Sequence, residues 1–403
     1  MINVKVIDNA KFSTAMLGCF LRLPLTQHNL GYATLLCKLA NNQSAAFPSI
    51  EIQERKLSEL YDFKFNAQPM TFGSSLLIGF TGEFIEPRLV NDPAYRIDEV
   101  VETFAKIVLQ PSFDQEHLEL AKRQLADECQ EMMNDPEFMG SEKFFEIWYQ
   151  KHPEYSLSLI KALQHAQQAD TASIARFWAN AQTFPALLLG SSQSKVTLQR
   201  AIVDQLGGLD IATPFLDQNL NVPIDLDLSA DETVEAGASQ AYLFYGLGSD
   251  EPLSLKEQLI ASLLSEYLTG DPSSQLFRRV REVMSASYSI NSNSFGQNNL
   301  LLIQAGVDRD KWQECDDVIM TVLDELQNGQ IDHDAFLAAK HNLVRTYTAL
   351  EDRQASAIGQ LLREALIPDF AEFDRLSRLK RLTMNDLEKL AQKLTLRERF
   401  RLL

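Results

Sequence analysis

The sequence predicts an α+β protein made of two homologous domains, each a mixed, mostly antiparallel sheet with helices packed on one side. Three observations predict this class. Predicted strands alternate with long helical patterns, some strands follow one another as hairpins, and the order of elements in the first half recurs in the second. The chain has 403 residues, and 45% of them are hydrophobic, which is ample material for two cores.

The first half begins with a strand and two helices. Residues 11–23, KFSTAMLGCFLRL, form the apolar run of a mostly buried strand. Residues 28–40 carry leucine and alanine at helical spacing, and residues 48–61 predict a second helix with Pro48 in its first turn. The rest of this half predicts a strand pair, four helices, a strand and a last helix, at 62–69, 73–83, 95–109, 114–134, 137–149, 171–181, 183–191 and 194–206.

A segment without periodicity separates the halves. Residues 207–230 are rich in Gly, Pro, Asp and Asn, a composition typical of linkers. We expect an N-terminal domain at 1–215, a linker at 216–230 and a C-terminal domain at 231–403.

The second half repeats the plan of the first. It predicts a strand, a helix, a strand pair and four helices, at 239–247, 254–268, 284–293, 299–306, 309–328, 332–351, 354–366 and 383–394. Two local matches support a duplication: TFGSSLLIGFTG at 71–82 resembles SFGQNNLLLIQAG at 294–306, and FDQEHLELAK at 113–122 resembles IDHDAFLAAK at 331–340.

Charge and cysteine usage limit the partners and the compartment. A formal net charge of −18 repels nucleic acid and anionic membrane surfaces, so we expect neither as a partner. The 4 cysteines lie far apart without a CxxC spacing, which fits a reducing compartment. The N-terminus has no secretory pattern, and no apolar run reaches about 18 residues, so we expect a soluble, cytoplasmic protein.

Residue types alone indicate no complete catalytic site. The 6 histidines form no HxxEH, HExxH or HxH motif, and phosphate-binding and nucleophile-elbow motifs are absent. Cys37 lies on an apolar helix, where packing is the default role, although a hydrolase using Cys37 stays an alternative. Arg281 at the end of a helix-like segment and Tyr288 in the next strand could be surface residues, or could bind a peptide carbonyl.

Together these segments resemble the inverzincin family, which includes insulinase, pitrilysin, the mitochondrial processing peptidases and smaller bacterial relatives. SFDQEHLELAKRQLADECQEMMNDP at 112–136 resembles the family's helix after the sheet. GDPSSQLFRRVREVMSASYSI at 270–290 resembles the signature of its C-terminal half. The family is built from duplicated α+β domains, so the resemblance covers nearly the whole chain.

The resemblance implies that the zinc motif is degenerate. In active relatives the helix containing GYATLLCKL reads GxxHFLEHxxF, where two histidines hold zinc and the glutamate activates water. Alignment on Gly31 puts Thr34 and Lys38 at the histidines and Cys37 at the glutamate, and Glu128 falls on the third ligand. We therefore expect no metal or other cofactor in this chain, and an ion pair or water-bridged contact between Lys38 and Glu128.

The resemblance also implies a role beside an active chain. Active relatives use an arginine and a tyrosine seven residues apart to grip substrate and polarise the scissile carbonyl, which is the spacing of Arg281 and Tyr288. The chain resembles the non-catalytic subunit of two-chain bacterial peptidases, with an HxxEH-containing homologue as partner that carries the zinc. Its opening and the segment EDRQASAIGQLL resemble the inactive member of a Gram-positive pair, one of which is associated with elongation factor P modification.

Further expectations follow from this reading. A sheet edge could pair with an extended peptide substrate, and homodimers are possible. The alternative is a structural or peptide-binding scaffold that has no peptidase partner.

Overall fold

The computed structural model describes residues 3–283 and 289–403, and it divides into two compact units. Each unit is assembled from three segments of the chain. Unit 1 comprises Met1–Gln130, Leu157–Leu220 and Glu351–Ala371. Unit 2 comprises Glu131–Ser156, Asn221–Leu350 and Glu372–Leu403. The change of unit after Leu220 falls inside the predicted linker, but the segments around 131–156 and 351–371 do not follow the boundaries predicted at 215 and 231.

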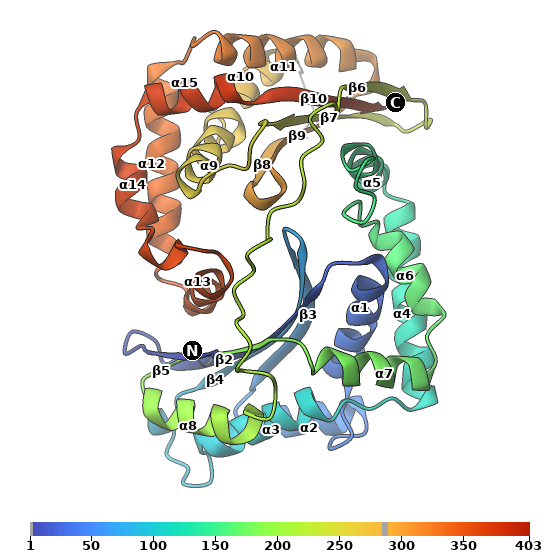
Figure 1. The fold of residues 1–403 in the computed structure, drawn as a ribbon, viewed down its shortest axis with the longest axis vertical. Coiled ribbons are helices and arrows are strands. Elements are labelled where there is room, and N and C mark those ends of the chain that lie inside the picture. The colour runs from blue at the N-terminus through green and yellow to red at the C-terminus, as the bar shows by residue number, and fades with distance from the viewer. Residues whose placement is uncertain (1–2, 284–288) are drawn as a thin grey trace. The chain divides into compact units, whose positions relative to one another are not determined.

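Unit 1 contains a five-stranded mixed sheet (Figure 1). The order is β1-β5-β2-β4-β3, with β1 and β5 parallel and the other neighbours antiparallel. The strands are β1 Val4–Asp8, β2 Thr14–Pro24, β3 Lys64–Phe72, β4 Ser75–Ile85 and β5 Ala186–Ser192.

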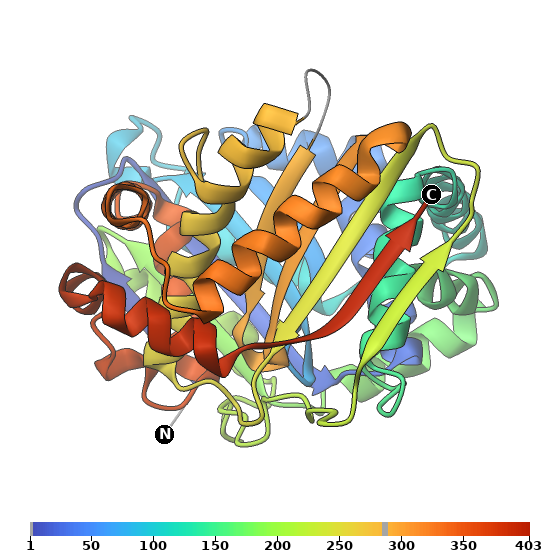
Figure 2. The same ribbon diagram turned by 90° about the horizontal axis from the view of Figure 1, so that it is seen from above.

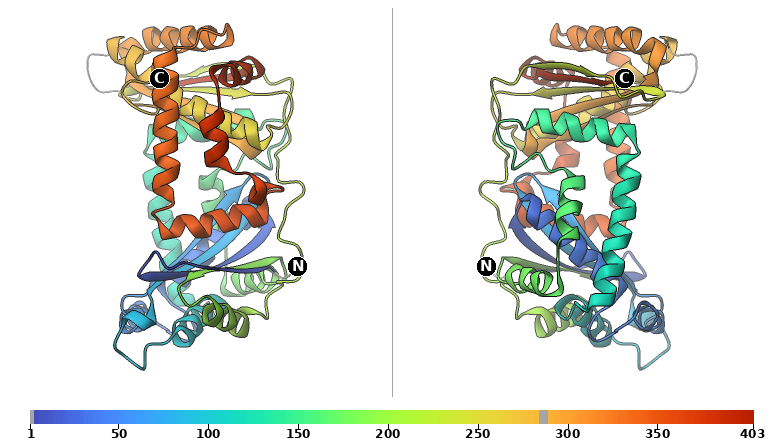
Figure 3. Two further views of the ribbon diagram at one scale, coloured as in Figure 1. Left: turned by 90° about the vertical axis from the view of Figure 1, so that its left-hand side faces the viewer. Right: turned by 90° about the vertical axis from the view of Figure 1, so that its right-hand side faces the viewer.

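Helices cover this sheet on both faces, whereas the sequence pattern predicts helices on one side, because α13, which comes from the second half of the chain, packs on the face opposite α3 and α8. Helices α3 and α8 pack together on one face, where Phe104 of α3 contacts Phe63 and Phe65. Helix α13 lies against β2 and β5 on the other face, where Ile358 approaches Gly18 (Figure 3). The helices of unit 1 are α1 Gln27–Asn42, α2 Ile50–Glu59, α3 Ile97–Leu109, α6 Leu159–Gln167, α7 Thr171–Ala181, α8 Lys195–Leu206 and α13 Gln354–Leu366, together with most of α4 Gln115–Met133.

Unit 2 repeats the topology of unit 1 strand by strand. Its order is β6-β10-β7-β9-β8, with β6 and β10 parallel and the other neighbours antiparallel. The same order with the same single parallel pair confirms the predicted duplication and the α+β class. The strands are β6 Ala230–Val234, β7 Gln240–Gly248, β8 Ser289–Phe295, β9 Leu300–Asp308 and β10 Thr395–Leu402.

The unit 2 sheet is also covered on both faces. Most of its helices pack over one face, which Figure 2 shows from above. On the other face Phe144 of α5 stacks on Phe244 with ring centroids 6.1 Å apart, and Phe400 joins the same cluster. The helices of unit 2 are α5 Pro136–Trp148, α9 Leu255–Thr269, α10 Gln275–Val283, α11 Trp312–Gln327, α12 His333–Leu350, α14 Arg375–Arg381 and α15 Met384–Lys393. Short 3-10 turns lie at Pro87–Leu89, Gly296–Asn298, Arg309–Lys311 and Phe370–Glu372.

Strand β10 is the main element that the sequence patterns did not indicate. Its alternate residues Arg399 and Arg401 give one face charged side chains instead of apolar ones, while a bulge between Leu396 and Glu398 takes Arg397 out of this alternation. That face is buried because Asp316 of α11, itself 3% exposed, accepts hydrogen bonds from Arg399 Nε over 3.0 Å and from Tyr245 Oη over 2.6 Å. The other elements that were not predicted are β1, β6, α6 and α14, all short.

None of the helices in the described ranges 3–283 and 289–403 is both long enough and apolar enough to cross a membrane.

Candidate functional site

Helix α1 carries the degenerate motif and is positioned by a cap and by a close approach. The Thr26 side chain accepts a hydrogen bond from the Asn29 backbone N–H over 3.1 Å, which starts the helix. Gly31 lies where the backbone of α6 comes close, since a Cβ there would be 2.2 Å from the Ala162 carbonyl oxygen. Gly31 is therefore required by helix packing, whatever the chemistry of the residues that follow it.

The side chains at two of the motif positions, Thr34 and Cys37, are bonded or buried within unit 1. The Thr34 hydroxyl donates to the Leu30 carbonyl over 2.8 Å, within its own helix. Cys37 is 2% exposed, and burial raises the pKa of its thiol. Because the thiolate is the nucleophilic form, this buried thiol gives the alternative of a Cys37 hydrolase no support.

Lys38 and Glu128 form the predicted ion pair. Lys38 Nζ lies 2.5 Å from Glu128 Oε1, which joins α1 to α4. The side chains are 28% and 44% exposed, so the pair is partly screened and contributes modestly to stability. The prediction of a contact between these two residues is confirmed.

The residues at this position do not fit a zinc ion. Zinc needs three or four neutral or anionic donors, whereas this site offers an ammonium, a hydroxyl bonded to the backbone and a buried thiol. Glu128 alone could ligate, and it is bonded to Lys38. Across the residues that the structure describes, no group of three His, Cys, Asp or Glu side chains could hold a metal.

Arg281 lies in the last turn of α10, on its exposed side. The buried side of the helix carries Leu276 and Val280, both 0% exposed. Arg279 in the same turn is held by Glu325 of α11 at 2.6 Å. The helix is thus fixed by its other residues, and the Arg281 guanidinium is presented to solvent. Tyr288, the second residue of the predicted pair, lies outside the described residues.

Sequence reasoning missed Asn41, which lies one turn beyond Lys38 on α1. Its side chain bonds to both backbone groups of Ala67 in β3, at 2.9 Å and 2.8 Å. Its spacing of three residues from Lys38 was the available signal, because such residues share a helix face.

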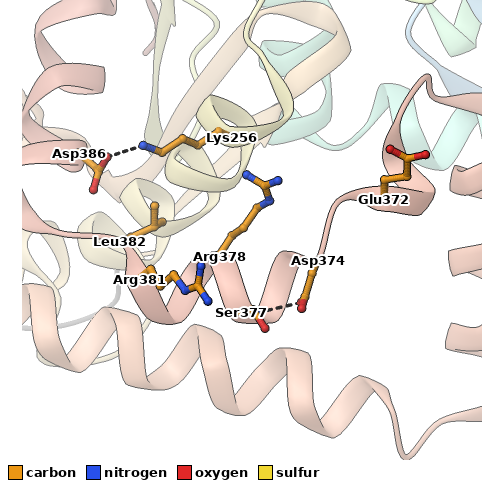
Figure 4. A pocket seen from close by; sticks show the side chains of 8 residues that line it. All are labelled: Lys256, Glu372, Asp374, Ser377, Arg378, Arg381, Leu382 and Asp386. Carbon is orange, nitrogen blue, oxygen red and sulfur yellow. Dashed lines mark hydrogen bonds and ion pairs between the residues drawn. The ribbon is translucent and has the colours of Figure 1, made fainter.

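A separate hollow lies in unit 2 among α9, α14 and α15 (Figure 4). Its volume is about 480 Å³, and Lys256 at its rim pairs with Asp386 at 2.7 Å. Its charges balance, since three basic and three acidic side chains line it: Lys256, Arg378, Arg381, Glu372, Asp374 and Asp386. This balance gives no preference for an anion or a cation, and no predicted site residue lies there.

Comparison with known proteins gives one domain match and several matches of the whole fold. Residues 196–343 match the family model described as the peptidase M16 inactive domain. No curated protein sequence matches the chain.

Three solved structures share the fold over almost the entire chain. A conserved protein from Enterococcus faecalis V583 has a TM-score of 0.86 at 17% identity, covering 99% of this chain and 95% of its own. A protease from Helicobacter pylori has a TM-score of 0.79 at 15% identity, covering 100% and 97%. A peptidase M16 inactive domain from Pseudomonas fluorescens has a TM-score of 0.77 at 15% identity, covering 99% and 95%. Residues 196–343 thus match the inactive domain of the peptidase M16 family, which supports the predicted resemblance over this part of the chain, and the whole chain shares the fold of these solved structures.

Proposed function

We propose that this chain is the zinc-free, non-catalytic subunit of a heterodimeric zinc peptidase. The observation that carries the proposal is the Lys38–Glu128 ion pair, because it occupies two of the positions that would ligate zinc in an active relative. The zinc and the HxxEH motif then belong to a homologous partner subunit. The partner's site performs the hydrolysis, and this chain closes the chamber.

The proposed contribution of this chain to the reaction comes from Arg281 and Tyr288. A guanidinium offers several donors in a fixed plane, which suits a peptide carbonyl or carboxylate. A phenol hydroxyl can donate to the oxygen that becomes negative when water attacks the scissile carbonyl. The exposure of Arg281 at the end of α10 supports its part in this role.

The compartment and the subgroup belong to the same proposal. We propose a cytoplasmic location, supported by four buried cysteines, Cys19, Cys37, Cys129 and Cys315, that form no disulfide. We also propose that the chain belongs to a two-chain bacterial system of the elongation factor P modification-associated type, as its opening motifs suggest.

The test is reconstitution with an HxxEH-containing homologue encoded beside this chain. The two chains are co-expressed, purified as a complex and assayed for peptide cleavage and zinc content. We expect cleavage by the complex, no cleavage by this chain alone, and one zinc per heterodimer. A stable complex that lacks peptidase activity would favour the alternative of a structural or peptide-binding scaffold.

Substitutions in this chain then test the assigned residues. Arg281→Ala and Tyr288→Phe in the complex should each lower kcat/KM, by on the order of 100-fold for the loss of an oxyanion donor. Arg278→Ala is the matched control, since Arg278 lies on the same helix and its guanidinium is 3.8 Å from Asp332. Unchanged kcat/KM in both test variants would contradict the assigned role.

A further inference from the structure

Strand β3 is the outer edge of the unit 1 sheet, and one side chain occupies its centre. Asn41 Nδ2 donates to the Ala67 carbonyl over 2.9 Å, and the Ala67 N–H donates to Asn41 Oδ1 over 2.8 Å. The amide thus satisfies both backbone groups of Ala67, as a residue of a neighbouring strand would. Ala67 is 4% exposed although it lies on an edge strand.

The pleat of β3 identifies which residues an added strand would need. In an antiparallel pair alternate residues direct their backbone groups toward the partner strand and away from it. Because the groups of Ala67 point away from β4, those of Pro69, two residues on, point the same way. Proline has no backbone N–H to donate. Ala67 and Pro69, the two central residues of the edge, therefore offer no free backbone N–H to an added strand.

Asn41 is fixed in place by the end of α1, which lies alongside β3 (Figure 1). The Gln53 side chain, 1% exposed, donates to the carbonyls of Ala40 over 2.9 Å and of Asn41 over 3.3 Å. These bonds hold the last turn of α1 from beneath. The Asn41 residue is itself exposed, so an approaching strand would have to displace its side chain.

We propose that Asn41 and Pro69 close the β3 edge of unit 1 to the addition of an extended polypeptide strand. The pairing of a peptide with a sheet edge that the sequence suggested therefore does not use β3. Closure rests on these contacts and is independent of the proposed function. In a heterodimer of the proposed kind, it follows that the peptide pairs with a strand other than β3.

Amide hydrogen exchange tests the contact itself in the isolated chain. In Asn41→Ala the Ala67 amide should exchange about tenfold faster than in the wild type, because it loses its acceptor. The Gln68 amide, which points toward β4, should keep its rate and so reports an intact sheet. Asn42→Ala is the matched control, since Asn42 lies beside Asn41 but bonds to Gln124. An Ala67 rate that is the same in Asn41→Ala and the wild type would overturn the proposal.

Binding of an unstructured polypeptide tests the closure. Fluorescently labelled oxidised insulin B chain is titrated with the wild type and with N41A/P69V, and anisotropy is measured. We expect no saturable binding to the wild type or to Asn42→Ala, and saturable binding to the double variant. Equal binding to the wild type and the double variant would refute closure. So would an absence of binding to a double variant whose Ala67 amide exchanges fast. Neither measurement involves zinc or a partner, so failure here leaves the proposed function standing, and the reverse holds.

Discussion

The burial of the Glu398 carboxyl group predicts an unusual dependence of stability on pH. It lies in β10 at 0% exposure, and neither carboxyl oxygen has a hydrogen-bond partner among the described residues. It is paired in register with Gly246, against which Trp148 and Phe144 of α5 pack. The residue therefore lies on the apolar face of the sheet, opposite the face on which Arg399 and Arg401 contact Asp316.

The sign and size of the effect follow from burial. Burial raises the pKa of Glu398 from 4.5 to about 10, and the nearby Glu232 carboxylate adds to the shift. The folded protein therefore holds a proton that the unfolded chain releases above pH 4.5, and stability falls as the pH rises toward about 10. At about 1.4 kcal/mol for each pH unit, ionisation of the unfolded state costs on the order of 3 kcal/mol at pH 7.

Glu398→Gln removes this titration while keeping the side-chain size. We expect the variant to gain stability over the wild type by about 1.4 kcal/mol per pH unit between about pH 5 and pH 8. Urea unfolding is followed by tryptophan fluorescence in a Trp178→Phe background, which leaves Trp148 and Trp312, both in unit 2, as reporters. Glu251→Gln, an exposed carboxylate of the same unit, is the control. A stability difference between the variant and the wild type that does not change with pH would refute the reasoning.

Three further substitutions have defined outcomes. Asp316→Asn should lower the free energy of unfolding of unit 2 by about 3 kcal/mol, because it leaves a buried arginine cluster without its carboxylate. Urea unfolding measures this change, and a loss below about 1 kcal/mol would contradict that view. Gly31→Ala should lower the free energy of unfolding by about 1–3 kcal/mol, because the added methyl group collides with the α6 backbone. The change is measured as a lower urea midpoint, and an unchanged midpoint would show that α6 can move away. The triple variant T34H/C37E/K38H should bind about one zinc per chain, where the wild type binds none, by elemental analysis after dialysis. A metal-free triple variant would mean that α1 and α4 no longer hold zinc-binding geometry.

The candidate site was partly predictable from the sequence. The spacing of Thr34, Cys37 and Lys38 on one helix could be aligned with a zinc motif, and the resemblance linked Lys38 to a carboxylate 90 residues away. Lys38 and Glu128 occupy two ligand positions of the same zinc site and carry opposite charges. A contact between them could therefore be predicted without the precise geometry of the site. The spacing of Asn41 from Lys38 shows that the two share a helix face, but Asn41 was missed because its partner is the backbone of Ala67, which no residue type identifies.

The sequence by itself determined the duplicated plan of strands and helices, since apolar periodicity records which face of each element is buried. Only the tertiary structure decided which sheet each helix covers. Helix α5 packs on the sheet of unit 2, although α4 before it belongs mainly to unit 1, and helix α13 packs on the sheet of unit 1, although α12 before it belongs to unit 2. Strand β10 buries arginines whose sequence pattern indicates surface charge. The physical reason is that periodicity is a local property of the chain. Contacts between residues far apart in sequence determine what packs against a buried face, what pairs with a buried charge such as Asp316, and what bonds to an edge strand such as β3.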